Sequence, residues 1–82
     1  MKVYLEPMFG DAKTNIERAK IQLAKALGFR GTITAVKAGR RYLMAEIKIS
    51  TRWDLSPSER VKYLREWLPS RVQHFKVSFK EG

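Results

Sequence analysis

The chain has 82 residues, with 17 Lys and Arg against eight Asp and Glu and a formal net charge of +9 at pH 7. A chain of this length buries only one modest core, so we expect a single domain over residues 1–82. The sequence has no cysteine, which excludes disulfide frameworks, thiolate zinc sites and cysteine nucleophiles. Its first residues, MKVYLEPMFGD, do not resemble a signal peptide, and no apolar run reaches membrane-spanning length, so we expect a cytoplasmic protein.

The first predicted elements are a short strand and an amphipathic helix. Residues 2–6 alternate in polarity, which is typical of a strand. From residue 12 to residue 27 the spacing becomes helical, with one apolar stripe made of Ile16, Ala19, Leu23, Ala26 and Leu27. Asp11 is placed to cap the start of this helix, and Gly28 to end it. The opposite side is predicted to face solvent and carries Arg18, Gln22 and Lys25.

The next predicted unit is a β-hairpin. Residues 31–50, GTITAVKAGRRYLMAEIKIS, contain two β-rich segments around a turn at residues 38–40. In the second strand the inward face consists of Leu43, Ala45, Ile47 and Ile49. The outward face consists of Tyr42, Met44, Glu46 and Lys48. On the first strand we expect Thr34 and Val36 on this same outward face.

A second helix and a last strand complete the chain. The segment LSPSE predicts a helix start, with Ser56 as the cap, Pro57 at the first helical position and Glu59 closing a capping box. The predicted buried stripe is Val61, Leu64 and Leu68. Residues 72–80 alternate again, with Phe75, Val77 and Phe79 inward and His74, Lys76 and Ser78 outward.

The element order is strand, helix, strand, strand, helix, strand. Two right-handed crossovers in this order interleave into an α+β, ferredoxin-like βαββαβ sandwich. We therefore expect a four-stranded antiparallel sheet with two helices on one face, the first and third strands at its centre and its other face open.

Catalytic and metal sites find little support in the sequence. The only histidine is His74, and the carboxylates are scattered singly. The segment LGFRGTITA, residues 27–35, resembles the segment after the first helix of acylphosphatases, which share this fold. That family has a catalytic asparagine on the following strand, where this chain has Ala35, and its arginine-bearing phosphate loop is replaced by EPMFGDAK, residues 6–13. The resemblance supports the fold and argues against the activity, so we expect no enzyme, no metal and no cofactor.

The charge distribution favours a polyanionic partner. From Arg18 to Ala45 the chain has seven basic residues and no acid. Self-repulsion of this size costs stability, so we expect a polyanion such as nucleic acid to offset it. Arg40 and Arg41 lie at the predicted hairpin tip, flanked by Lys37, where they can reach phosphates. Arg71 is expected near the same end of the sheet. The alternatives are that the charge serves solubility alone and that the tip is a solvated turn.

The hairpin also suggests base stacking. RRYLMAEI, residues 40–47, is similar to the third-strand motif of the RNA-recognition motif in Arg40, Tyr42 and Met44, with Arg41 in place of a glycine. The resemblance implies stacking on Tyr42 and on Tyr4 of the first strand. Alternatively, the two tyrosines cover the sheet or form a dimer interface. The candidate nucleic-acid-binding residues are Arg40, Arg41, Lys37, Tyr42, Tyr4, Lys48, Arg30, Lys25 and Arg18, with DNA and RNA both open.

A protein-interaction role is the second hypothesis. The chain would then be an inhibitor, an adaptor or a phage-type accessory protein without catalytic activity, and a homodimer is one form of it. Trp53, Leu55 and Trp67 are expected to close one end of the core, and the alternative is an exposed aromatic and arginine patch with Arg60. Ile21 faces away from the helix stripe and is a further contact candidate.

Overall fold

The computed structural model describes residues 1–79, which form four strands and two α-helices. The strands are β1 (Lys2–Pro7), β2 (Gly31–Ala38), β3 (Leu43–Ile49) and β4 (Phe75–Phe79). The helices are α1 (Ile16–Leu27) and α2 (Pro57–Trp67), with short 3₁₀ turns η1 (Lys13–Asn15), η2 (Gly28–Arg30) and η3 (Leu68–Ser70) beside them. The last strand was predicted over residues 72–80; it begins at Phe75, and Lys80 lies outside the described residues.

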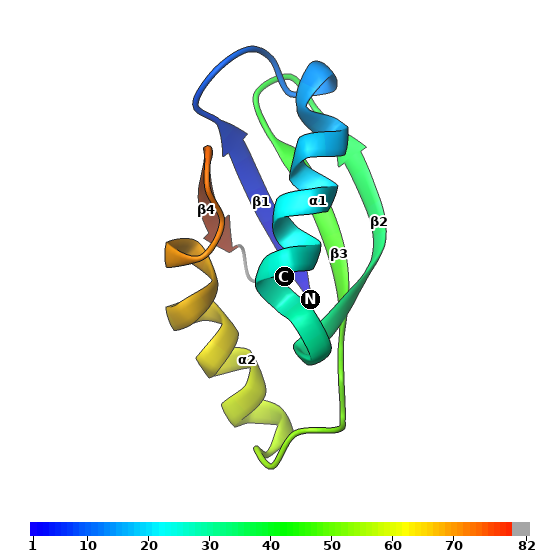
Figure 1. Ribbon diagram of the computed structural model, residues 1–82, viewed down its shortest axis with the longest axis vertical. Coiled ribbons are helices and arrows are strands. Elements are labelled where there is room, and N and C mark those ends of the chain that lie inside the picture. Colours follow the sequence, from blue (N-terminus) through cyan, green and yellow to red (C-terminus); the bar gives the residue numbers. More distant parts are fainter. Residues whose placement is uncertain (80–82) are drawn as a thin grey trace.

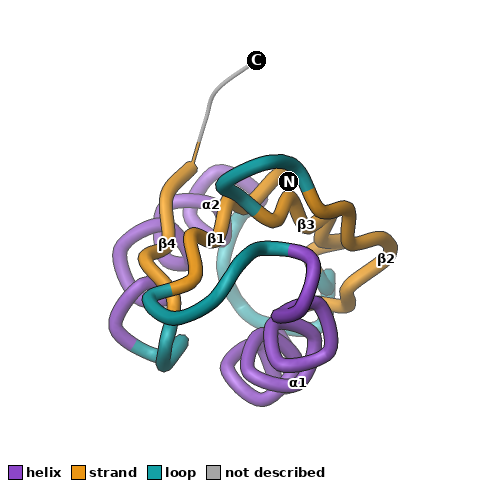
Figure 2. Tube along the Cα trace, turned by 90° about the horizontal axis from the view of Figure 1, so that it is seen from above, coloured by secondary structure: helices purple, strands orange, loops and turns teal. Residues whose placement is uncertain are grey.

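The four strands form one antiparallel sheet in the order β2-β3-β1-β4. The two central strands are therefore β1 and β3, as predicted. In Figure 1, α1 crosses in front of β1 and β3, and α2 lies to its left, below β4. The view from above shows α1 on one side of the curved sheet (Figure 2).

One hydrophobic core joins the sheet to both helices. On the sheet, alternation places Val3, Leu5, Leu43, Ala45, Ile47 and Phe75 inward, and all are buried. The predicted stripe of α1 is buried at Ala19, Leu23, Ala26 and Leu27, while Ile16 is half-buried against the core. The second helix contributes less, because Leu64 is its one buried residue and Leu68 follows in η3. Because α2 has so small an apolar face, it touches the rest of the fold mainly at its C-terminal end.

The prediction for the outward face of β2 is wrong at Val36. Ile33 pairs with Ile47 and Ala35 pairs with Glu46, so Thr34 is an extra residue that forms a bulge. Beyond the bulge the side chains change faces, and half-buried Val36 packs against the core. Lys37 instead pairs with Met44 on the open face.

The hairpin turn lies later than predicted. It occupies residues 39–42, where the Gly39 N–H donates to the Tyr42 carbonyl oxygen at 2.7 Å. Tyr42 therefore precedes β3 instead of opening it, and 43% of its surface is exposed. Arg40 and Arg41 form the exposed tip of this turn, as predicted.

Both ends of α1 follow from local chemistry. The helix was predicted from residue 12 with Asp11 as its cap, but α1 begins at Ile16 and has no side-chain cap; the Asp11 carboxylate instead accepts a hydrogen bond from the Thr14 backbone N–H of η1 at 2.8 Å. The buried Asn15 side chain ties the preceding loop to this turn, because its amide donates to the carbonyl oxygens of Phe9 and Asp11. The helix ends where Gly28 adopts a φ of +57°, a left-handed conformation that favours glycine.

The start of α2 is the predicted capping box. The Ser56 hydroxyl accepts from the Glu59 backbone N–H, and the Glu59 carboxylate accepts from the Ser56 backbone N–H, each at 3.3 Å. Pro57 occupies the first helical position. Hydrogen bonds from the Ser56 side chain and then from its backbone lower the pKa of Glu59 below its usual 4.5, so the carboxylate stays ionised where the cap needs it.

Candidate anion-binding site

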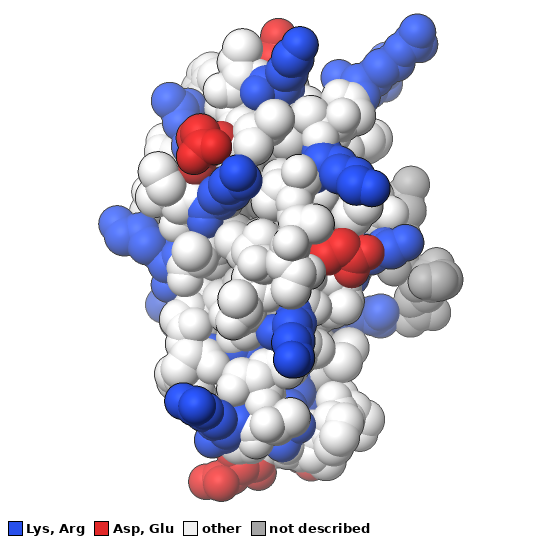
Figure 3. All heavy atoms as spheres, turned by 90° about the vertical axis from the view of Figure 1, so that its right-hand side faces the viewer, with Lys and Arg blue, Asp and Glu red and all other residues white. Residues whose placement is uncertain are grey.

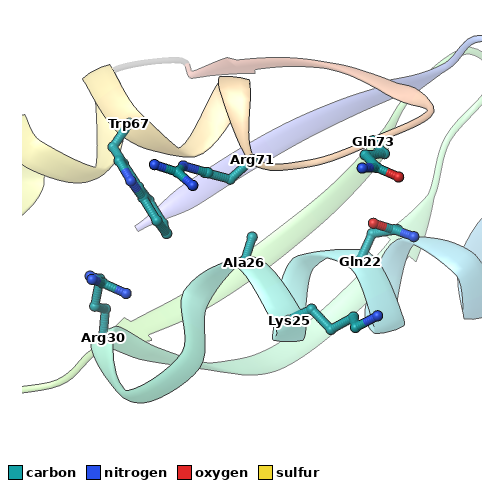
Figure 4. A pocket seen from close by; sticks show the side chains of 7 residues that line it. All are labelled: Gln22, Lys25, Ala26, Arg30, Trp67, Arg71 and Gln73. Carbon is teal, nitrogen blue, oxygen red and sulfur yellow. The ribbon is translucent and has the colours of Figure 1, made fainter.

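A basic hollow of about 370 Å³ lies between α1 and the end of α2, and we call it the α1–α2 groove. It is lined by Gln22, Lys25, Ala26, Arg30, Trp67, Arg71 and Gln73, which Figure 4 shows. Three of these residues are cationic, and none of the described residues that line the hollow is acidic. With no acid to offset them, the three charges focus a positive potential in the hollow.

Two separate segments supply the two walls. Gln22, Lys25 and Ala26 recur at helical spacing along one side of α1, and Arg30 follows in η2. Trp67 is the last residue of α2, and Arg71 and Gln73 follow η3. In Figure 4, Trp67 points from the α2 side toward Arg30, the Arg71 side chain points toward Trp67, and Gln22 faces Gln73 across the groove.

A row of aromatic rings supports the groove from behind. Trp67 stacks on Tyr63 with the ring centroids 5.7 Å apart, and Tyr63 meets Trp53 edge-on at 5.4 Å. Trp53 in turn meets Phe29 edge-on at 6.4 Å. The Trp53 indole N–H donates to the Ser50 carbonyl oxygen at 2.6 Å, which fixes the orientation of this ring. The row packs against the core at Trp53, Tyr63 and Trp67 and ends at Phe29, which is 62% exposed.

The aromatic row bears on both interpretations of Trp53 and Trp67, namely that they close one end of the core or form an exposed patch with Arg60. Trp53 and Trp67 pack against the core, as the first interpretation predicts. Arg60 does not join a surface patch through them, because its guanidinium donates to the carbonyl oxygens of Thr51 and Trp53 and so anchors the connection before α2. The arginines that do meet the rings are Arg30 and Arg71.

The rings hold both arginines in place. The Arg30 Cζ atom lies 4.8 Å from the ring centroid of Phe29, 5.7 Å from that of Tyr63 and 4.6 Å from that of Trp67. The Arg71 Cζ atom lies 5.1 Å from the centroid of Trp67. A guanidinium over a ring loses rotational freedom but keeps its N–H donors in its own plane, where a phosphate oxygen binds. The groove therefore presents two guanidinium groups whose positions are restricted by aromatic rings.

The hairpin tip is less favourable to an anion. Arg40 and Arg41 line a separate hollow of about 440 Å³ together with Glu6 and Asp11. Hydrogen bonds from the Thr14 backbone and then from its hydroxyl lower the pKa of Asp11, so its charge persists at neutral pH. The two carboxylates offset part of the arginine charge at the tip.

The remaining predicted residues do not line either of these two hollows. Arg18 is exposed on α1, and Lys37 is exposed on the open-face side of β2. Tyr4 is half-buried in the central strand β1, opposite Met44. Lys48 lines a third hollow of about 530 Å³ with Phe29 and Arg52. Figure 3 shows Lys and Arg along the full length of the face on the β2 side, with few acidic side chains among them.

Of the nine predicted binding residues, the structure brings Lys25 and Arg30 together in the groove and places Arg40 and Arg41 at the other hollow. Arg71 was expected near the tip, and it lines the groove instead. Sequence reasoning missed Trp67, Gln22 and Gln73 as lining residues. The helical spacing of Gln22, Lys25 and Ala26 identifies one wall, but nothing in the sequence identifies which segment faces it.

Residues 1–79 contain no group of three or more histidine and acidic side chains placed to bind a metal ion. Within the same range, neither the length nor the apolar character of any helix suffices to cross a membrane. No protein-family model matches the sequence, and comparison with curated proteins and with solved structures gives no match.

Proposed function

We propose that this chain is a nucleic-acid-binding protein, not an enzyme, and that the α1–α2 groove holds backbone phosphates. The main support for the proposal is that Lys25, Arg30 and Arg71 line one hollow that no described acidic residue lines. Arginines in a preorganised geometry bind phosphate oxygens through two parallel hydrogen bonds, and lysine adds a point charge. Gln22 and Gln73 supply amide donors beside them.

The extent of the basic surface favours a polymer over a small anion. The net charge of +9 exceeds what one phosphate would neutralise. A second hollow with Lys48 and Arg52 continues the positive surface, again without an acid among the described residues that line it. Phosphate contacts spread over such a surface provide most of the affinity of sequence-independent binding.

We also infer that the fold is ferredoxin-like. The strand order β2-β3-β1-β4 and the two helical crossovers support this assignment. In this fold the RNA-recognition motif stacks bases on the open face of the two central strands. Tyr4 lies on that face, and Tyr42 lies in the adjoining turn, so they form a secondary contact in our proposal.

The proposal is tested by fluorescence anisotropy with a labelled oligonucleotide and two pairs of charge variants. Lys25→Gln with Arg71→Gln removes two phosphate contacts of the groove, and both side chains are exposed, so folding should be little affected. At about 50 mM salt, the loss of two contacts weakens single-strand binding by about 50-fold. The control pair, Lys62→Gln with Lys13→Gln, removes the same charge from exposed positions outside the groove.

Comparison of the two variant pairs distinguishes binding at a defined site from a general effect of net charge. We expect the groove pair to bind far more weakly than the control pair. Equal losses for both pairs would show that net charge alone drives binding and would refute the groove as the site. Absence of binding by the wild type to single-stranded DNA, duplex DNA and RNA at low salt would refute the function.

One observation favours a second candidate function, a contact with another protein. Met8 and Phe9 are 62% and 71% exposed in the loop after β1, next to the hollow that Arg40 and Arg41 line. Exposed apolar side chains beside arginines are typical of protein interfaces. Light scattering during size exclusion tests the self-association form of this proposal. A dimer that Phe9→Asp converts to a monomer would support it, and a wild-type monomer at high concentration would refute it.

A further inference from the structure

The short turn η2 separates two basic hollows. Arg30 lines the α1–α2 groove, whereas its neighbour Phe29 lines the hollow that contains Lys48 and Arg52. The two hollows measure about 370 Å³ and 530 Å³, and neither has an acid among its described lining residues. An anionic chain that crosses η2 thus meets three cations on one side and two on the other.

The ring of Phe29 stands at this crossing. It is 62% exposed, although it belongs to the aromatic row that packs against the core. Its edge-on contact with Trp53 and the Arg30 guanidinium 4.8 Å from its centroid restrict its motion. A base that stacks on a ring already held in place loses less conformational freedom than one that must order a mobile side chain.

We propose that single-stranded nucleic acid crosses η2, with one base stacked on Phe29 and the flanking phosphates in the two hollows. This inference rests on the proposed function and names the form of its ligand. Bases of a single strand expose their faces to aromatic side chains, whereas bases in a duplex are already stacked on their neighbours. Cations on both sides of one exposed aromatic ring match the alternation of phosphate and base along a single strand.

Phe9 provides a matched control within the same chain. It is even more exposed than Phe29, at 71%. It lies in the loop between β1 and η1, beside a hollow that contains Glu6 and Asp11. A nonspecific effect of removing an exposed phenylalanine should therefore be the same at both positions, but a stacking platform exists only at Phe29.

The experiment compares Phe29→Ala, Phe29→Trp and Phe9→Ala with the wild type. Anisotropy is measured with a single-stranded oligonucleotide of about 12 nucleotides and with the corresponding duplex. We expect Phe29→Ala to weaken single-strand binding by about tenfold without changing the salt dependence, because it removes a stacking contact and no charge. Phe29→Trp should retain the affinity, and Phe9→Ala should match the wild type. Duplex binding should be weaker and insensitive to Phe29→Ala.

A second readout reports stacking independently of affinity. A 2-aminopurine base in the oligonucleotide should be quenched at saturating wild-type protein, and Phe29→Ala should lose this quenching. The inference is overturned if Phe29→Ala binds and quenches like the wild type, or if duplex binds more tightly than single strand. Neither result affects the proposed function, which fails if the wild type binds no nucleic acid, or the assignment of the groove, which fails if the groove variants behave like their control.

Discussion

Replacing Arg30 by Lys tests whether the arginine is held by the aromatic row. The substitution keeps the positive charge but removes the planar guanidinium that contacts three rings, with Cζ to centroid distances of 4.6 to 5.7 Å. Each cation–π contact is worth about 0.5–1 kcal/mol near the surface, and lysine retains part of it. We therefore expect Arg30→Lys to cost about 1 kcal/mol in the free energy of unfolding.

The measurement is thermal unfolding followed by circular dichroism. For a domain of this size, about 1 kcal/mol lowers the Tm by about 4–8 °C. Arg18→Lys is the control, because Arg18 is exposed on α1 outside the groove, and it should leave the Tm unchanged. If Arg30→Lys unfolds at the wild-type temperature, the ring contacts do not hold the guanidinium and the preorganisation of the groove is refuted.

Three further substitutions test the fold, each by urea unfolding. Leu64→Ala removes the one buried side chain of α2 and should cost about 2–5 kcal/mol; a loss near zero would show that α2 is not docked on the core. Gly28→Ala should cost about 1–3 kcal/mol through backbone strain alone, since φ is +57° and nothing lies within 4 Å of the added Cβ; an unchanged midpoint would contradict the left-handed conformation. Ser56→Ala should cost about 1 kcal/mol at neutral pH. Because the pKa of Glu59 is lowered in the folded protein, the contribution of its carboxylate is present above pH 4.5 and fades as the pH falls through the folded pKa. The difference between the wild type and Ser56→Ala should therefore shrink in acid to the contribution of the backbone hydrogen bond to the Ser56 hydroxyl; a constant difference would contradict this role of Glu59.

The sequence predicts well those parts of the fold that depend on local chemistry. The capping box of Ser56 and Glu59 and the helix end at Gly28 are both present. Each depends on residues within one or two turns of one another, so their spacing is sufficient to identify them. The central position of β1 and β3 also follows, because short crossovers allow few strand orders.

The bulge at Thr34 shows where local pattern fails. Residues 32–35 alternate in polarity, but Val36 directly follows apolar Ala35, and one extra residue in the ladder changes the face of every later side chain. Val36 thereby packs against the core beside its partner Ala45, and Lys37 reaches the open face. The adjacent apolar residues Ala35 and Val36 mark the break, but only the pairing with β3 shows that Val36 and not Ala35 faces the core.

Only one wall of the groove could be predicted from the sequence, because the contact between its two walls is tertiary. Lys25 and Arg30 were identified from the acid-free basic stretch. Their partners Trp67 and Arg71 come from the end of α2 and the connection to β4, far away in the chain. The packing of the two helices on one core brings these segments together. The residue spacing within either segment does not predict this contact.

The salt dependence of single-strand binding tests the central claim most directly. Five cations line the two hollows beside η2, namely Lys25, Arg30, Arg71, Lys48 and Arg52. With about 0.7 counterions released per contact, the wild-type affinity should fall by about 100-fold between about 50 mM and 200 mM salt. The variant with Lys25→Gln and Arg71→Gln should lose only about 20-fold over the same range. Identical slopes for the two proteins would contradict the assignment of phosphate contacts to the groove.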